Sequence, residues 1–167
     1  MSVPIVVTIA GSDSSGGAGI EADLKTFSAL GVYGACVITA LTAQNTNGVF
    51  GIHSVPVDFI VAQINAVFTD LDVAAVKIGM LGDAPAIDVV AAALDRYRRR
   101  NVVLDPVLAA SSGEHLLHQD AIGRLRELIR RVRVITPNLP EAAALLPPIT
   151  FLRRWSRRTR KTSKSTA

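Results

Sequence analysis

The chain has 167 residues, 49% of them hydrophobic and 19% charged, which is typical of one globular domain with a sizeable core. No apolar run reaches the roughly 18 residues of a membrane-spanning helix, and the first segment lacks the basic start of a signal peptide, so we expect no membrane partner. The single cysteine, Cys36, excludes an internal disulfide framework and favours the cytoplasm, and no Cys/His group has zinc spacing.

The net charge of +4 is concentrated at one end of the chain. Seven of the 18 Lys/Arg residues follow residue 150, and none of the 14 acidic residues does. This stretch has no helical or strand period. We therefore expect one domain over residues 1–148 and a basic, disordered tail over residues 149–167. A tail with one aromatic residue, Trp155, does not predict a nucleic-acid-binding protein.

Segments typical of strands and helices alternate along the chain. In chain order they are strand 3–10, loop 11–19, helix 20–30, strand 33–42, helix 56–68, strand 74–78, helix 84–98, strand 101–105, helix 120–131, strand 133–136 and helix 139–146. Gly31 is a C-terminal stop for the first helix, and the second helix is expected to turn Phe59 and Val67 inward. This alternation predicts an α/β fold with a parallel sheet covered on both faces.

Ligands of such folds bind at the carboxyl ends of the strands. The segments that follow the expected strands are Gly11-Ser12-Asp13, Gln44-Asn45, Gly79-Met80, Asp105-Pro106 and Pro137-Asn138. These polar and glycine-rich segments should therefore meet at one edge of the sheet, where we expect the functional site.

The glycine-rich loop, residues 11–19, can turn backbone N–H groups toward an anion or a polar ligand. Residues 17–22 also satisfy the dinucleotide fingerprint G-x-G-x-x-A. That fingerprint should begin directly after the strand and be followed by an acidic residue about 20 positions on, and neither condition holds. The phosphate-loop signature is absent. A flexible connection that starts the helix remains an alternative.

Four polar residues near the expected strand ends are candidates for ligand contact, and a structural role is the alternative for all of them except Gln44. Asp23 either favours the helix dipole or accepts hydrogen bonds from a ligand amine. Gln44 can donate and accept in one plane, which suits a heteroaromatic ring with an amino group beside a ring nitrogen. Asn138 and Glu141 form a capping-box pair, with Pro140 in the first turn, at a helix start that also suits phosphate and hydrated magnesium.

Six segments together resemble the hydroxymethylpyrimidine/phosphomethylpyrimidine kinases in order and spacing, from about residue 3 to residue 146. They are AGSDSSGGAGIEADLKTFSALGVYG, VITALTAQNTNGV, VKIGMLGD, NVVLDPVL, SSGEHLL and VITPNLPEAAALL. The resemblance implies a ribokinase-like, three-layer α/β/α sandwich with a mostly parallel sheet. It also implies transfer of the ATP γ-phosphate to 4-amino-5-hydroxymethyl-2-methylpyrimidine and then to its monophosphate, in thiamine diphosphate biosynthesis.

The same resemblance implies roles for nine residues. The pyrimidine-binding residues would be Gly11, Asp23, Gln44, Met80 and Val107. The residues on the side of ATP and Mg²⁺ would be Lys77, Asp105, Asn138 and Glu141, with Asp105 and Glu141 as metal ligands. Without the resemblance, Met80 and Val107 would be interpreted as core residues.

Members of the family carry, beyond the Asn-x-x-Glu helix, a second glycine motif, Gly-Thr-Gly-Cys, which forms the anion hole and supplies the candidate base. This sequence has no such motif, and Cys36 lies on the second expected strand. We therefore expect a fold that is incomplete at its C-terminal end and assign no catalytic residue. Two alternatives stay open: an inactive remnant that binds pyrimidine weakly, and a pyridoxal or pyridoxine kinase. A homodimer is compatible with either.

Overall fold

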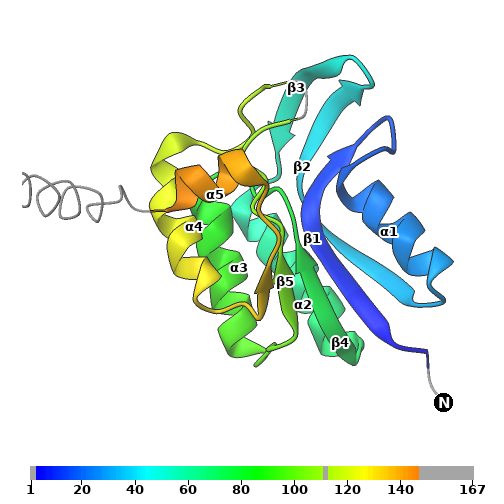
Figure 1. The fold of residues 1–167 in the computed structure, drawn as a ribbon. Coiled ribbons are helices and arrows are strands. Elements are labelled where there is room, and N and C mark those ends of the chain that lie inside the picture. The colour runs from blue at the N-terminus through cyan, green and yellow to red at the C-terminus, as the bar shows by residue number, and fades with distance from the viewer. Residues whose placement is uncertain (1–2, 111–112, 147–167) are drawn as a thin grey trace, which may run out of the picture.

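The computed structural model describes residues 3–110 and 113–146, which form a six-stranded sheet with helices packed against it (Figure 1). The strand order is β3-β2-β1-β4-β5-β6. The strands are β1 (Ile5–Asp13), β2 (Tyr33–Asn45), β3 (Gly48–Ser54), β4 (Val73–Ile78), β5 (Val102–Leu104) and β6 (Val134–Ile135). All neighbouring strands are parallel except β2 and β3, which are antiparallel.

The helices lie in two layers, one on each side of the sheet (Figure 1). They are α1 (Gly19–Ala29), α2 (Val57–Asp70), α3 (Ala84–Arg96), α4 (Ile122–Ile129) and α5 (Leu139–Leu145), with a short 3₁₀ turn, η1 (Gln119–Ala121). Helix α1 packs on β1 and β2, whereas α2, α3 and α4 pack side by side on the opposite face. Right-handed crossovers explain this division, because the chain moves from β1 to β2 in one direction and then reverses to reach β4.

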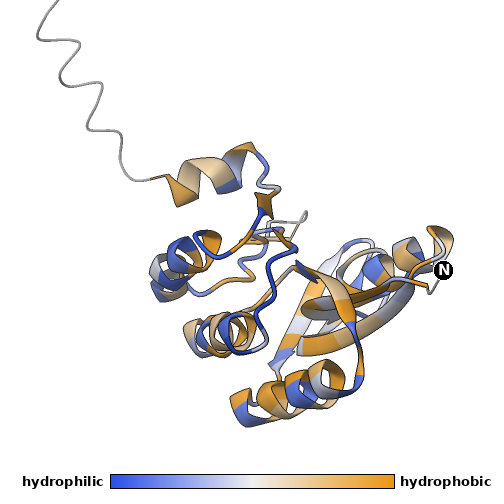
Figure 2. Ribbon diagram, turned by 90° about the horizontal axis from the view of Figure 1, so that it is seen from below, coloured by the Kyte–Doolittle hydropathy of each residue, from blue (hydrophilic) through white to orange (hydrophobic). Residues whose placement is uncertain are grey.

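The main core lies between the sheet and helices α2, α3 and α4. Figure 2 shows that hydrophobic residues dominate the strands, whereas the helices carry both hydrophobic and hydrophilic residues. Alternate residues of β1, β4 and β5 are fully buried here; they include Ile9, Ile78 and Leu104. The apolar strand pattern in the sequence thus predicts the core-facing side of the sheet correctly.

Two local signals in the sequence are confirmed by the structure. Gly31 has φ of +69° and follows α1 in a Schellman motif, in which the Val32 N–H bonds to the Phe27 carbonyl oxygen. Asn138 caps α5 and forms a capping box with Glu141, because each side chain accepts a bond from the other residue's backbone N–H. These signals act within one turn of helix, so they hold in any tertiary setting.

Strand β3 is missing from the sequence-based prediction, which also ends β2 three residues early. The β2–β3 ribbon projects beyond the helices (Figure 1), and most of β3 is exposed. An exposed ribbon has no buried face, so it shows neither an apolar run nor strict alternation. The Asn47-Gly48 turn signal was the only feature of the sequence that indicated the β2–β3 hairpin.

Two further expectations about burial are wrong. Phe59 was predicted to face inward from α2, but its side chain is 60% exposed, whereas Val67 packs against the core. Within the described residues, α1 covers only β1 and β2, so Val103 and Val134, on β5 and β6, remain partly exposed. The helices of the described residues therefore do not cover the whole width of the sheet on both faces.

The expected tail over residues 149–167 lies outside the described residues. Across residues 3–110 and 113–146, no helix is both long and apolar enough to cross a membrane.

Candidate functional site

A cavity of about 620 Å³ opens at the carboxyl ends of the central strands. The chain reverses direction between β1 and β4, and ligands of open α/β sheets bind at such a point. All nine residues singled out in the sequence line this one cavity: Gly11, Asp23, Gln44, Lys77, Met80, Asp105, Val107, Asn138 and Glu141. They come from β1, β2, β4, α1, α5 and the loops that follow β4, β5 and β6. Only the tertiary fold brings them together.

The glycine-rich loop is held by a carboxylate of its own, that of Asp13. This side chain is 3% exposed. It accepts hydrogen bonds from the backbone N–H groups of Ser15, Gly17 and Ala18 at 2.8, 3.0 and 2.8 Å, and from the Ser15 hydroxyl at 2.8 Å. Three of the loop N–H groups that the sequence analysis offered to an external anion are therefore already bonded to the Asp13 carboxylate.

The pKa of Asp13 lies below its ordinary value of 3.8. Burial raises this pKa, but the hydrogen bonds from Ser15, Ala18 and Gly17 outweigh burial because they favour the charged form. Sequence reasoning missed this role, although an Asp before a Ser/Gly-rich loop often bonds to backbone N–H groups that follow it.

Glu21, on α1, fixes the loop from its other side. Its two carboxylate oxygens accept bonds from the Ser12 hydroxyl and from the Asp13 N–H, both at 2.7 Å. The start of α1 is therefore tied to the end of β1. The sequence analysis gave Glu21 no role, because its partners lie eight and nine residues away and no short-range motif signals them.

Asp23 and Lys77 form an ion pair in the wall of the cavity. Lys77 Nζ donates to Asp23 Oδ2 at 2.8 Å, and the two side chains are 23% and 17% exposed, respectively. The Thr8 hydroxyl donates to the same oxygen at 2.6 Å. Asp23 thus does more than favour a helix dipole, since its carboxylate links α1 to both central strands.

Gln44 lies near the end of β2 and is half-buried. Its backbone N–H and carbonyl both bond to the Ser14 hydroxyl, at 2.9 and 2.7 Å, so the strand end is joined to the glycine-rich loop. Its side-chain oxygen lies 3.2 Å from the Thr42 hydroxyl. The amide is therefore held at the cavity wall, where it can meet a planar polar ligand.

The cavity also has an apolar side. Met80, Ala40 and Leu116 are buried together, and Val107 packs against them. The polarisable Met80 thioether and the Val107 side chain suit contact with the face of an aromatic ring. Both residues have a packing role and line the cavity, so the core and ligand interpretations hold together.

The acidic side of the cavity is formed by Asp105 and Glu141. Asp105 Oδ1 accepts a bond from the Thr136 hydroxyl at 3.3 Å. Glu141 is 8% exposed, and one of its oxygens accepts from the Asn138 N–H at 2.8 Å. Both carboxylates keep oxygens that no described protein group occupies, and hard cations such as Mg²⁺ prefer such ligands.

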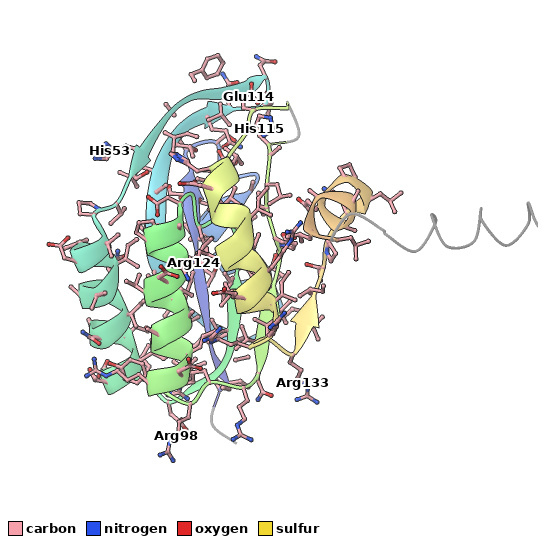
Figure 3. All side chains as sticks on the ribbon, turned by 90° about the vertical axis from the view of Figure 1, so that its left-hand side faces the viewer. His53, Arg98, Glu114, His115, Arg124 and Arg133 are labelled. Atoms are coloured by element: carbon pink, nitrogen blue, oxygen red, sulfur yellow. The ribbon has the colours of Figure 1, made fainter. Side chains whose placement is uncertain are left out.

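The described part of the chain contains no group of three or more His, Cys, Asp or Glu residues arranged to hold a metal ion. Figure 3 shows His53 projecting outward from β3, while His115 lies beside Glu114 at the far end of another loop. Arg98 and Arg133 point away from the opposite end of the molecule. His53 and His115 therefore lie apart, on different segments of the chain.

Comparison with known proteins identifies relatives of this chain. The family model described as phosphomethylpyrimidine kinase matches residues 13–164, beyond Leu146, where we expected the similarity to end. The hydroxymethylpyrimidine/phosphomethylpyrimidine kinase of Escherichia coli strain K12 is 56% identical over 141 residues, covering 84% of this chain and 53% of the relative. The Bacillus subtilis strain 168 protein of the same name is 51% identical over 146 residues, covering 87% and 54%.

Solved structures agree with these matches. Phosphomethylpyrimidine kinase from Clostridium difficile 630 superposes with a TM-score of 0.81 at 46% identity, covering 95% of this chain and 69% of that one. An ADP complex of Bacillus subtilis pyridoxal kinase gives a TM-score of 0.77 at 34% identity, covering 96% and 63%. The predicted ribokinase-like α/β fold is thus confirmed. The chain spans about half the length of the curated relatives it matches, and it belongs to the phosphomethylpyrimidine kinase family.

Proposed function

We propose that this chain carries the pyrimidine-binding part of an enzyme that phosphorylates 4-amino-5-hydroxymethyl-2-methylpyrimidine, and then its monophosphate, with ATP in thiamine diphosphate biosynthesis. One observation carries the proposal: nine residues from separate elements line a single cavity at the switch point of the sheet. The relatives named as kinases of this pyrimidine support the choice of substrate.

The cavity walls match the chemistry of an aminopyrimidine. In the proposal, Gln44 meets the ring nitrogen and the exocyclic amine, since its amide both donates and accepts. Asp23 accepts a further hydrogen bond from the ligand, and Met80 and Val107 cover the ring face. Gly11 closes the wall at the end of β1.

ATP and magnesium would bind through Lys77, which is paired with Asp23, and through Asp105, Asn138 and Glu141. Mg²⁺ is usually held by one or two carboxylates together with water and phosphate oxygens, and the oxygens left free on Asp105 and Glu141 fit that requirement. When bound, the metal would neutralise phosphate charge. Asn138 and Glu141 hold the start of α5 in place by their capping box.

Replacing Gln44 with alanine is expected to weaken binding of the aminopyrimidine by about 1–3 kcal/mol, because a buried polar group of the ligand loses its partner. Isothermal titration calorimetry with the unphosphorylated pyrimidine measures the loss. Gln63 is a matched control, since its amide bonds to the Ile38 backbone and neither residue lines the cavity. Equal affinities of wild type and Gln44→Ala would remove Gln44 from the site.

A pyridoxal kinase is the second candidate, and the structural likeness to pyridoxal kinases at 28–34% identity favours it. The two candidates are separated by competition: pyridoxal should displace the aminopyrimidine only weakly if the proposal is right. A coupled assay of ATP consumption with each substrate then distinguishes an active kinase from a protein that only binds its ligand.

We further propose that the protein acts in the cytoplasm, where ATP is available and the free thiol of Cys36 stays reduced.

We also propose a homodimer formed through β3. This strand is an edge of the sheet, contains no charged residue and exposes Phe50 (71%) and Ile52 (46%), so two copies can approach it without charge repulsion. Analytical ultracentrifugation of wild type and Phe50→Lys tests this, and a monomeric wild type would refute it.

A further inference from the structure

We propose that Thr8 and Gly79 are positioning residues for ligand recognition, because they hold the Lys77–Asp23 pair in the one arrangement that leaves an oxygen of Asp23 for a ligand N–H. The inference rests on the proposed function. It assigns a role to two residues outside the nine candidate site residues, and it places Lys77 beside Asp23 in the cavity wall.

Thr8 is a polar residue in the middle of an apolar strand. It is 0% exposed, as are its neighbours Val7 and Ile9. A buried hydroxyl in such a place needs a hydrogen-bond partner, and its partner is Asp23 Oδ2 at 2.6 Å. This bond holds the Asp23 carboxylate in one orientation.

Lys77 reaches the same carboxylate because the sheet places it beside Thr8. The two residues are direct partners in the parallel register of β1 and β4, so their side chains leave the sheet on one face. Lys77 Nζ then lies 2.8 Å from Asp23 Oδ2. One oxygen of Asp23 therefore receives both donors.

Gly79 supplies the space for this reach. It is two residues after Lys77 and shares its face of the sheet. A Cβ at position 79 would lie 3.0 Å from Lys77 Nζ and 3.0 Å from the Ala10 Cβ. Even alanine would therefore crowd the ammonium group and the Ala10 side chain, so that Lys77 would have to change its position beside Asp23.

The arrangement has a consequence for the ligand. Asp23 Oδ1 accepts no hydrogen bond from the residues that the structure describes, while Oδ2 carries two. Lys77 also neutralises the carboxylate, and it is the single Lys or Arg among the residues lining the cavity. An uncharged ring that donates an N–H, such as an aminopyrimidine, is the chemistry this oxygen suits.

The test compares Thr8→Val with Thr8→Ser, and Gly79→Ala with wild type, in calorimetric titrations of two ligands. One ligand is 4-amino-5-hydroxymethyl-2-methylpyrimidine, and the other is the same ring without its amino group. We expect Thr8→Val and Gly79→Ala to bind the aminopyrimidine about tenfold or more weakly, the usual loss for one hydrogen bond to a charged group. The ring without the amino group should bind nearly unchanged, and Thr8→Ser should restore the aminopyrimidine affinity.

Thr26→Val is the matched control, because its hydroxyl bonds to the Ala22 carbonyl on the exposed side of α1 and it does not line the cavity. A Thr8→Val variant that loses equal affinity for both ligands, or that Thr8→Ser does not rescue, would overturn the inference. A wild type that binds both rings equally would also overturn it while leaving the proposed function intact. A wild type that binds neither ring would refute the proposed function itself.

Discussion

Asp13→Ala is expected to lower the free energy of unfolding by about 2–4 kcal/mol, one of the largest effects of any single substitution in this chain. The Asp13 carboxylate is buried and accepts bonds from three backbone N–H groups and one hydroxyl of the glycine-rich loop. Removing it leaves these donors without a partner beside the cavity. Chemical denaturation measures the loss, and aminopyrimidine binding should fall with it because the loop lines the site.

The control is Asp88→Ala. Asp88 is an exposed acid whose side chain is 53% accessible and lies 3.6 Å from Arg124, so its removal should change stability by less than about 0.5 kcal/mol. Equal losses for the two variants would mean that the loop does not depend on Asp13.

Asp13→Asn tests the same hydrogen bonds through their dependence on pH. Because the pKa of Asp13 is lowered from 3.8 in the folded protein, its charge contributes stability that is fully present above about pH 5. This contribution is lost as the pH falls below 3.8 and through the folded pKa. The stability difference between wild type and Asp13→Asn should therefore shrink in that acidic range, and a constant difference would contradict the assignment.

Gly19→Ala is expected to lower the free energy of unfolding by about 3–5 kcal/mol, or to prevent folding of the N-terminal part of the sheet. Gly19 has φ of +57°, and a Cβ there would lie 2.3 Å from the Gly11 carbonyl oxygen. That atom belongs to the backbone of β1 and cannot move aside as a side chain can. Helix α1, with Glu21 and Asp23, would have to shift away from the site.

Gly31→Ala separates the two causes. Gly31 has φ of +69°, but nothing lies within 4 Å of its added Cβ, so only backbone strain of about 1–2 kcal/mol is expected. The difference between the two variants measures the close approach of α1 to β1. Thermal and denaturant unfolding of both variants provide the comparison, and similar losses would show that backbone conformation alone explains Gly19.

The sequence by itself determined what depends on neighbours along the chain. The Asn138–Glu141 capping box and the stop at Gly31 were predicted correctly because their donors and acceptors lie within five residues. The apolar runs at residues 3–10 and 74–78 likewise identified β1 and β4 as strands, because that pattern is local to the chain. Because parallel strands end at a common edge, the sequence also predicted that the five segments after the strands would meet, and residues from all five line the cavity.

Only the tertiary structure decided how those residues are arranged. Lys77 and Asp23 are 54 positions apart, and Thr8 and Asp23 are 15 apart, so no periodicity links them. Their pairing depends on the register of β1 against β4 and on the space that Gly79 leaves. The hydrogen bonds from the glycine-rich loop to Asp13 likewise depend on the dihedral angles of the loop, which the sequence pattern does not specify. Hydrogen bonds between distant segments form only after the backbone is placed, and sequence pattern alone carries no measure of that placement.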